Sequence, residues 1–214
     1  MMLKKLVLLS ALAFSAVSQA DVLSDIKPLQ ERWAEVNYSL AEKAKEQAFA
    51  ELVAHADQVV ATNPGQAEAL IWRGIIKSSY AGAKGGLGAL GLCEESKADL
   101  EKALELNPTA LQGSAYTSLG ALYFKVPGWP LGFGSDKKAR QLLEKAVSLN
   151  PQGIDPNYFY AEFLTEEREY KKAWEYLQKA KQAPARPDRL SADAGRQQEI
   201  ALLEQKLQKK LKKS

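Results

Sequence analysis

The chain has 214 residues, of which 46% are hydrophobic and 26% charged, so a packed core is possible and wholesale disorder is disfavoured. Its single Cys and single His exclude an internal disulfide framework and any zinc site built from several Cys and His ligands. The formal net charge is only +3 and no dense basic stripe occurs, which argues against nucleic-acid binding.

Residues 1–20 have the pattern of a secretory signal peptide. Two lysines precede an apolar run over residues 6–17, and small residues stand one and three positions before a cleavage point that follows Ala20. The run is shorter than the roughly 20 residues of a membrane-spanning helix. We therefore expect cleavage after Ala20 and a soluble, secreted protein, periplasmic in a Gram-negative source. Its lone Cys93 is then expected to be a buried free thiol, with an intermolecular disulfide as the alternative.

The rest of the chain repeats amphipathic helical segments that end at a proline. Residues 100–108 and 143–151 read LEKALELNP and LEKAVSLNP, which agree at seven of nine positions. Proline ends a helix because its ring clashes with the preceding turn and it has no N–H. Four such stops lie 44, 43 and 33 residues apart, at Pro64, Pro108, Pro151 and Pro184. Internal periods of this size are typical of stacked helical pairs.

The spacing within these segments resembles the tetratricopeptide repeat (TPR). The best copy comprises Tyr116, Leu119, Gly120, Tyr123, Ala139, Leu143, Ala146 and Pro151. The next copy comprises Tyr160, Ala161, Leu164, Tyr170, Ala173, Leu177 and Ala180, whereas the two earlier copies are degenerate. The resemblance covers residues 25–184. It implies an all-α, right-handed superhelical solenoid of about four helix pairs within residues 21–187.

Two of the units carry extra residues between their helices. Residues 81–91 are rich in glycine, and we expect a flexible loop there. Residues 126–134 combine two prolines with Trp129 and Phe133. Insertions in a solenoid map to one rim and often carry binding, and aromatic side chains dominate binding hot spots. Trp129 and Phe133 are therefore candidate anchors; the alternative is that this loop folds back over its own helices.

The second insertion, together with the following residues 153–160 (GIDPNYFY), is similar to periplasmic TPR proteins such as the T component of TRAP transporters. That resemblance implies a helical accessory protein that binds the transporter's substrate-binding subunit. Many proteins of that family are lipoproteins, and this sequence departs from them because it lacks the lipid-acceptor Cys.

Residues 188–214 are predicted to form a C-terminal capping helix with a basic tail. Ser191 or Asp193 is expected to cap its N-terminus. Its apolar stripe consists of Ile200, Leu203, Leu207 and Leu211. Five lysines gather at its end, where cations suit the helix dipole. The simplest interpretation is the polar cap that a terminal repeat needs; contact with a membrane surface or an acidic partner is the alternative.

No catalytic constellation emerges from the sequence. Residues 86–91 match GxGxxG, but that fingerprint requires a preceding strand and a βαβ unit, and neither is predicted here. His55 has no Ser or Cys partner indicated by the sequence. The adjacent glutamate pairs at 94–95 and 166–167 would point about 100° apart on a helix. We therefore predict a protein that is not an enzyme and that uses neither cofactor nor metal.

Stacked helix pairs form a concave groove lined by the first helix of each pair. Counting along those helices gives a largely apolar set: Ile71, Ile75, Ser78, Thr117, Ala121, Phe124, Tyr158, Glu162 and Thr165. The predicted binding residues of groove and rim are Ile71, Ile75, Phe124, Trp129, Phe133, Tyr158 and Glu162. Such a groove suits a helix or extended segment of a partner protein, such as a transporter's substrate-binding subunit. The alternative is a carrier of a small apolar ligand in a TRAP-type transport system.

Overall fold

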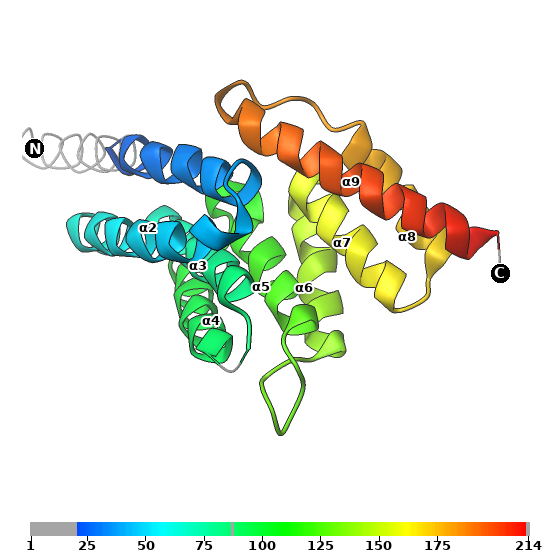
Figure 1. The fold of residues 1–214 in the computed structure, drawn as a ribbon, viewed down its shortest axis with the longest axis horizontal. Coiled ribbons are helices and arrows are strands. Elements are labelled where there is room, and N and C mark those ends of the chain that lie inside the picture. Colours follow the sequence, from blue (N-terminus) through cyan, green and yellow to red (C-terminus); the bar gives the residue numbers. More distant parts are fainter. Residues whose placement is uncertain (1–20, 87, 213–214) are drawn as a thin grey trace, which may run out of the picture.

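A computed structural model describes residues 21–86 and 88–212, and every regular element in these ranges is a helix (Figure 1). The predicted signal peptide lies outside the described residues. A first helix covers residues 21–38. The elements that follow are α2 (Glu42–Thr62), α3 (Ala67–Lys84), α4 (Gly88–Leu106), η1 (Ala110–Gly113), α5 (Ser114–Lys125), α6 (Asp136–Leu149), α7 (Ile154–Glu166), α8 (Tyr170–Lys181), η2 (Pro187–Arg189) and α9 (Leu190–Leu211).

The helices pack as consecutive pairs, as the repeats predict. The first helix precedes α2, and α3 packs on α4, α5 on α6, and α7 on α8. The last helix, α9, packs on α7 and α8 as a fifth layer. The prediction of an all-α repeat fold is confirmed. Among the described helices, none combines the length and apolarity needed to cross a bilayer.

The repeated Asn-Pro dipeptides form the same turn three times. The carbonyl of Asn63 accepts a hydrogen bond from the N–H three residues later at 3.2 Å, and those of Asn107 and Asn150 do the same at 3.2 and 3.1 Å. Each is a β-turn with proline at its second position, which suits the φ that the ring fixes. The recurring dipeptide thus ends one helix and directs the chain into the next.

Glycine lets the two helices of a pair approach closely. A Cβ placed on Gly120 would lie 2.7 Å from Cγ of Leu143, and one on Gly74 would lie 2.8 Å from Cγ of Leu100. Both leucines are fully buried. The small residues of the repeat pattern are therefore needed for packing between helices.

The glycine-rich segment 81–91 is mostly helical, so the expectation of a flexible loop is wrong for most of it. The extra residues lengthen α3 to Lys84 and start α4 at Gly88. The turn between them uses Gly85 and Gly86, both at φ 62°, in the left-handed region that glycine adopts without steric cost. The two lengthened helices pack on each other and so stabilise residues that would be a loop on their own.

The C-terminal helix buries the stripe that the sequence predicts, through Ile200, Leu203 and Leu207. The predicted N-terminal cap is wrong, because α9 begins before Ser191 and Asp193. Arg189 occupies the N-cap position and makes no side-chain capping bond. Asp193 instead accepts hydrogen bonds from the backbone N–H and Nε of Arg186, at 2.8 and 2.7 Å. The Asp193 carboxylate is therefore bound by Arg186, which lies outside α9, and it does not cap the helix.

Candidate functional site

The predicted groove residues divide into buried and half-buried sets. Ile71 and Tyr158 are buried, whereas Ile75, Phe124 and Glu162 are half-buried. The first helices of successive pairs pack on one another, α3 on α5 and α5 on α7. Part of the inner face is therefore buried within the chain. The expected exposure of Ile71 and Tyr158 is therefore corrected; any binding role for them stays a prediction.

Two of the half-buried members, Phe124 and Glu162, are linked through Lys125, an exposed residue at the end of α5. Lys125 donates a hydrogen bond to Glu162 at 2.8 Å, and its Nζ lies 5.1 Å from the ring centre of Phe124. An ammonium over an aromatic face is stabilised by the ring quadrupole. This part of the wall is thus a paired, amphipathic surface rather than a bare apolar one.

The C-terminal segment covers part of the inner face, at what we call the seam: Tyr38, Trp72, Asp155 and residues 186–199. The chain leaves α8, loops over and starts α9 beside the end of the first helix (Figure 1). Here the backbone of Gly195 lies so close to Tyr38 that an added Cβ would be 2.3 Å from Cγ of its ring. The Arg189 guanidinium lies 4.7 Å from the ring centre of Trp72. The two ends of the repeat array therefore meet.

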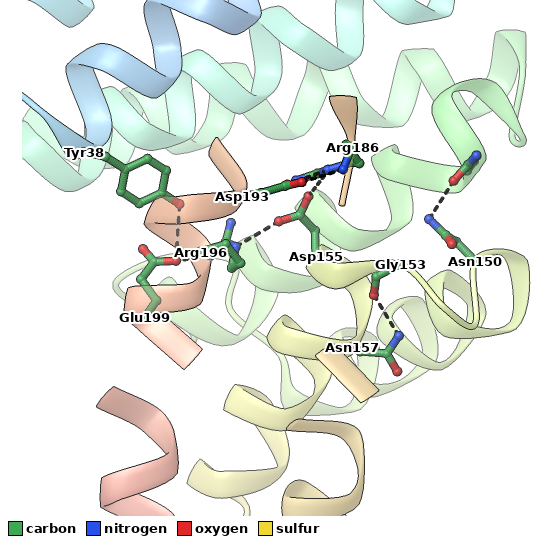
Figure 2. A network of polar contacts seen from close by, with 10 residues as sticks. Tyr38, Asn150, Gly153, Asp155, Asn157, Arg186, Asp193, Arg196 and Glu199 are labelled. Atoms are coloured by element: carbon green, nitrogen blue, oxygen red, sulfur yellow. Dashed lines mark hydrogen bonds and ion pairs between the residues drawn. The ribbon is translucent and has the colours of Figure 1, made fainter. Parts of the chain in front are cut away.

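A continuous polar network holds the seam (Figure 2). Arg196, only 7% exposed, donates to Asp155 at 2.9 Å and also to Glu199. Arg186 donates to the other oxygen of Asp155 at 2.8 Å. The hydroxyl of Tyr38 donates to Glu199 at 3.3 Å, which ties the first helix to the last. Aromatic rings complete the cover, since the Arg196 guanidinium lies 4.6 Å from the ring centre of Tyr158.

Burial and ion pairing shift the pKa values of the groups in this network. Burial alone would raise the pKa of Asp155, but Arg196 and Arg186 lower it to about 2. Burial raises the pKa of Tyr38 to about 12, so its hydroxyl stays protonated and can donate. Burial also raises the pKa of Glu199, against the opposing effect of Arg196. Because these groups are held in partnered states, the seam suits a structural role better than proton transfer.

The rim loop, residues 126–134, projects from the array between α5 and α6 (Figure 1). Its base is fixed by backbone hydrogen bonds from Gly134 N–H to the Pro127 carbonyl at 2.9 Å and from Ser135 N–H to the Tyr123 carbonyl at 2.8 Å. A Cβ on Gly134 would lie 1.9 Å from the carbonyl oxygen of Val126, so only glycine fits there.

The two predicted anchors of the rim loop have different surroundings. Phe133 is half-buried at the base and packs edge-on against Tyr123, with ring centres 5.5 Å apart. Trp129 stands at the tip and is 90% exposed, and Leu131 beside it is 70% exposed. The loop therefore packs on its own helices at its base and offers an apolar tip to solvent. Leu131 was not among the predicted residues, since an isolated leucine gives no signal in the sequence.

The remaining sequence candidates show no new chemistry. His55 is exposed on α2. Cys93 is a half-buried free thiol rather than a fully buried one, and burial raises its pKa. Across the part of the chain that the structure describes, no group of His, Cys, Asp and Glu is placed to hold a metal ion.

Comparisons with known proteins bear on the fold. No protein-family model matches the sequence, and no curated protein matches it significantly. The structure is similar to that of a thermophilic TPR protein from Thermus thermophilus, with a TM-score of 0.53 and 16% identity over 90% of this chain and 95% of that one. Two structures of MamA align with TM-scores of 0.44 and 0.43, each at 21% identity over 80% of this chain and 93% and 87% of theirs. The first likeness shows that the chain has a TPR-like fold.

Proposed function

We propose that this protein is a non-enzymatic scaffold that binds another protein, with the rim loop as its principal contact. The TPR-like fold supports this proposal, because a solenoid offers an extended surface and stacked repeats of this kind commonly serve as binding platforms. The acid–base groups of the polar network add support, since Asp155, Glu199 and Tyr38 are engaged in hydrogen bonds with one another or with arginines.

The observation that carries the proposal is the exposed tip formed by Trp129 and Leu131. An indole held out in water lacks the hydrophobic stabilisation that burial would give, and Trp is one of the residue types enriched at binding hot spots. The base of the loop is already fixed by hydrogen bonds. Little conformational entropy would therefore be lost when a partner covers the tip.

The location and the partner are proposed from the sequence. The signal-peptide pattern before Asp21 supports a periplasmic protein, and the resemblance of residues 126–134 and 153–160 to TRAP accessory proteins supports a transporter's substrate-binding subunit as the partner. N-terminal sequencing of the exported protein should begin at Asp21. A small apolar ligand in the groove gains no support, because Ile71 and Tyr158 are buried within the chain itself.

Replacing both tip residues, Trp129→Ser with Leu131→Ser, is expected to weaken partner binding at least about tenfold while leaving stability within about 0.5 kcal/mol of wild type. Both side chains are exposed, so their loss removes little packing within the protein. The measurement is quantitative cross-linking capture from a periplasmic extract of the source organism, followed by titration of the purified captured protein. Urea denaturation checks the fold of each variant.

Leu202→Ser is the matched control, since Leu202 is also exposed but lies on α9 away from the loop. It should leave binding unchanged. Equal affinity of the captured protein for the double variant and the wild type would remove the rim loop from the interface.

A further inference from the structure

We infer that Arg189, on the segment that joins α8 to α9, is a binding site for a single carboxylate group presented beside an apolar side chain. This inference deepens the proposed function by naming the chemistry of the partner, and it concerns a surface separate from the rim loop. It starts from a difference among the three arginines of the seam.

Two of these arginines form ion pairs with carboxylates, and the third does not. Arg186 contacts Asp155 and Asp193, and Arg196 contacts Asp155 and Glu199. Arg189 makes no side-chain hydrogen bond or ion pair with any residue of the described ranges. Its guanidinium is nevertheless not a freely solvated group, because it lies against the ring of Trp72 and its Nε is buried.

The two side chains in contact leave two buried donors without an acceptor. Besides Nε of Arg189, the indole Nε1 of Trp72 is buried and bonds to none of the described residues. Buried N–H groups in proteins are nearly always paired, so the orphaned donors mark this contact as the part of the seam that lacks an acceptor. Arg189 as a whole is only half-buried, so an acceptor from outside can approach its guanidinium. Burial and the positive charge of the neighbouring Arg186 lower the pKa of Arg189. A bound carboxylate would raise this pKa again, because a negative charge stabilises the protonated guanidinium.

The surroundings select the kind of acceptor. A guanidinium presents a planar fork of donors that matches a carboxylate. Asp155 and Asp193 lie close enough to act electrostatically on Arg189, and they would repel a doubly charged phosphate more strongly than a carboxylate. Leu190, the next residue, is 61% exposed and offers an apolar surface beside the charge. The geometry therefore fits an acidic side chain or terminal carboxylate with an apolar neighbour, or a free carboxylic acid with an apolar tail.

The test follows the indole N–H signals of the full chain in ¹⁵N-resolved NMR spectra, with the Trp72 signal assigned through Trp72→Phe. Isovalerate, a branched monocarboxylate, is titrated at constant ionic strength. We expect a saturable shift of the Trp72 signal that needs about tenfold more ligand, or is lost, in Arg189→Gln. Arg32→Gln removes an arginine from an exposed ion pair and should behave as the wild type. The other indole signals report whether each variant is folded.

Further arms distinguish the possible ligands. Acetyl-Leu-Glu-amide should shift the same signal and its Gln counterpart should not, if a partner protein supplies the carboxylate; a response to isovalerate alone assigns the site to a small acid. A shift of the same size in Arg189→Gln, no shift in the wild type, or an equal response to inorganic phosphate would overturn the inference. The Trp129→Ser, Leu131→Ser variant should still bind isovalerate. The carboxylate site at Arg189 can therefore be confirmed or rejected even if the rim loop proves not to be an interface.

Discussion

Asp155→Ala is expected to lower the free energy of unfolding by about 3 kcal/mol. The carboxylate accepts hydrogen bonds from both Arg196 and Arg186, and Arg196 is almost completely buried. Removing the carboxylate leaves a guanidinium in the seam with part of its charge uncompensated, and a buried unpaired charge is more costly than the pair was favourable. Urea denaturation followed by circular dichroism measures the loss.

Asp57→Ala is the matched control for this variant. Asp57 also pairs with an arginine, Arg73, at 3.0 Å, but its side chain is 52% exposed and Arg73 keeps a second partner in Asp99. Exposed pairs contribute about 0–1 kcal/mol, so this variant should stay close to wild type. Equal losses of unfolding free energy in the two variants would show that the ion pairs of Asp155 are as well solvated as the exposed pair of Asp57, and would contradict the prediction.

The same carboxylate should make stability depend on pH in a defined window. The pKa of Asp155 lies at about 2 in the folded protein, below its ordinary value of 3.8. Its contribution is therefore complete above about pH 4 and is lost as the pH falls towards 2. The urea midpoint of the wild type should fall over this interval, and Asp155→Asn should flatten that part of the fall. A variant whose midpoint falls as steeply as that of the wild type would contradict the assignment.

The sequence predicts helix ends and buried helix faces correctly, because these depend on residues that are close together in the chain. Proline at 108 and 151 ends a helix whatever the rest of the chain does, and alanine and leucine three and four residues apart mark the buried face of α6. The same reasoning overestimates loops. Residues 81–91 contain many glycines, yet most of them are helical because α3 and α4 support each other over their added length.

The seam could not be predicted, because its partners are far apart in the chain. Tyr38 and Glu199 are 161 residues apart, and nothing about a lone tyrosine or glutamate announces such a contact. The sequence predicts Tyr158 on the inner face, but it could not show that the Arg196 guanidinium would lie over the Tyr158 ring. Helix periodicity predicts on which face of its helix a residue lies. Whether that face is exposed to solvent depends on where the last helix packs, which periodicity does not predict.

Gly195→Ala tests whether the two ends of the array meet in solution, and we expect it to lower the free energy of unfolding by about 2 kcal/mol. Its Cβ would lie 2.3 Å from Cγ of Tyr38, at the stem of a ring that packs edge-on against Trp33, so the ring cannot simply rotate away. Tyr38→Ala alone should also destabilise, because it removes this packing and the bond to Glu199.

The informative measurement is the double variant Tyr38→Ala, Gly195→Ala. The alanine at 195 has nothing to clash with once the ring is gone, so the loss in the double variant should be smaller than the sum of the single losses by about 1–2 kcal/mol. Gly82→Ala provides the control: it lies in α3 with nothing within 4 Å of its added Cβ, and alanine there should be neutral or stabilising, since it favours the helix. Additive losses in the double variant would mean that Gly195 on α9 and Tyr38 on the first helix do not touch in solution, and that the seam does not close as described.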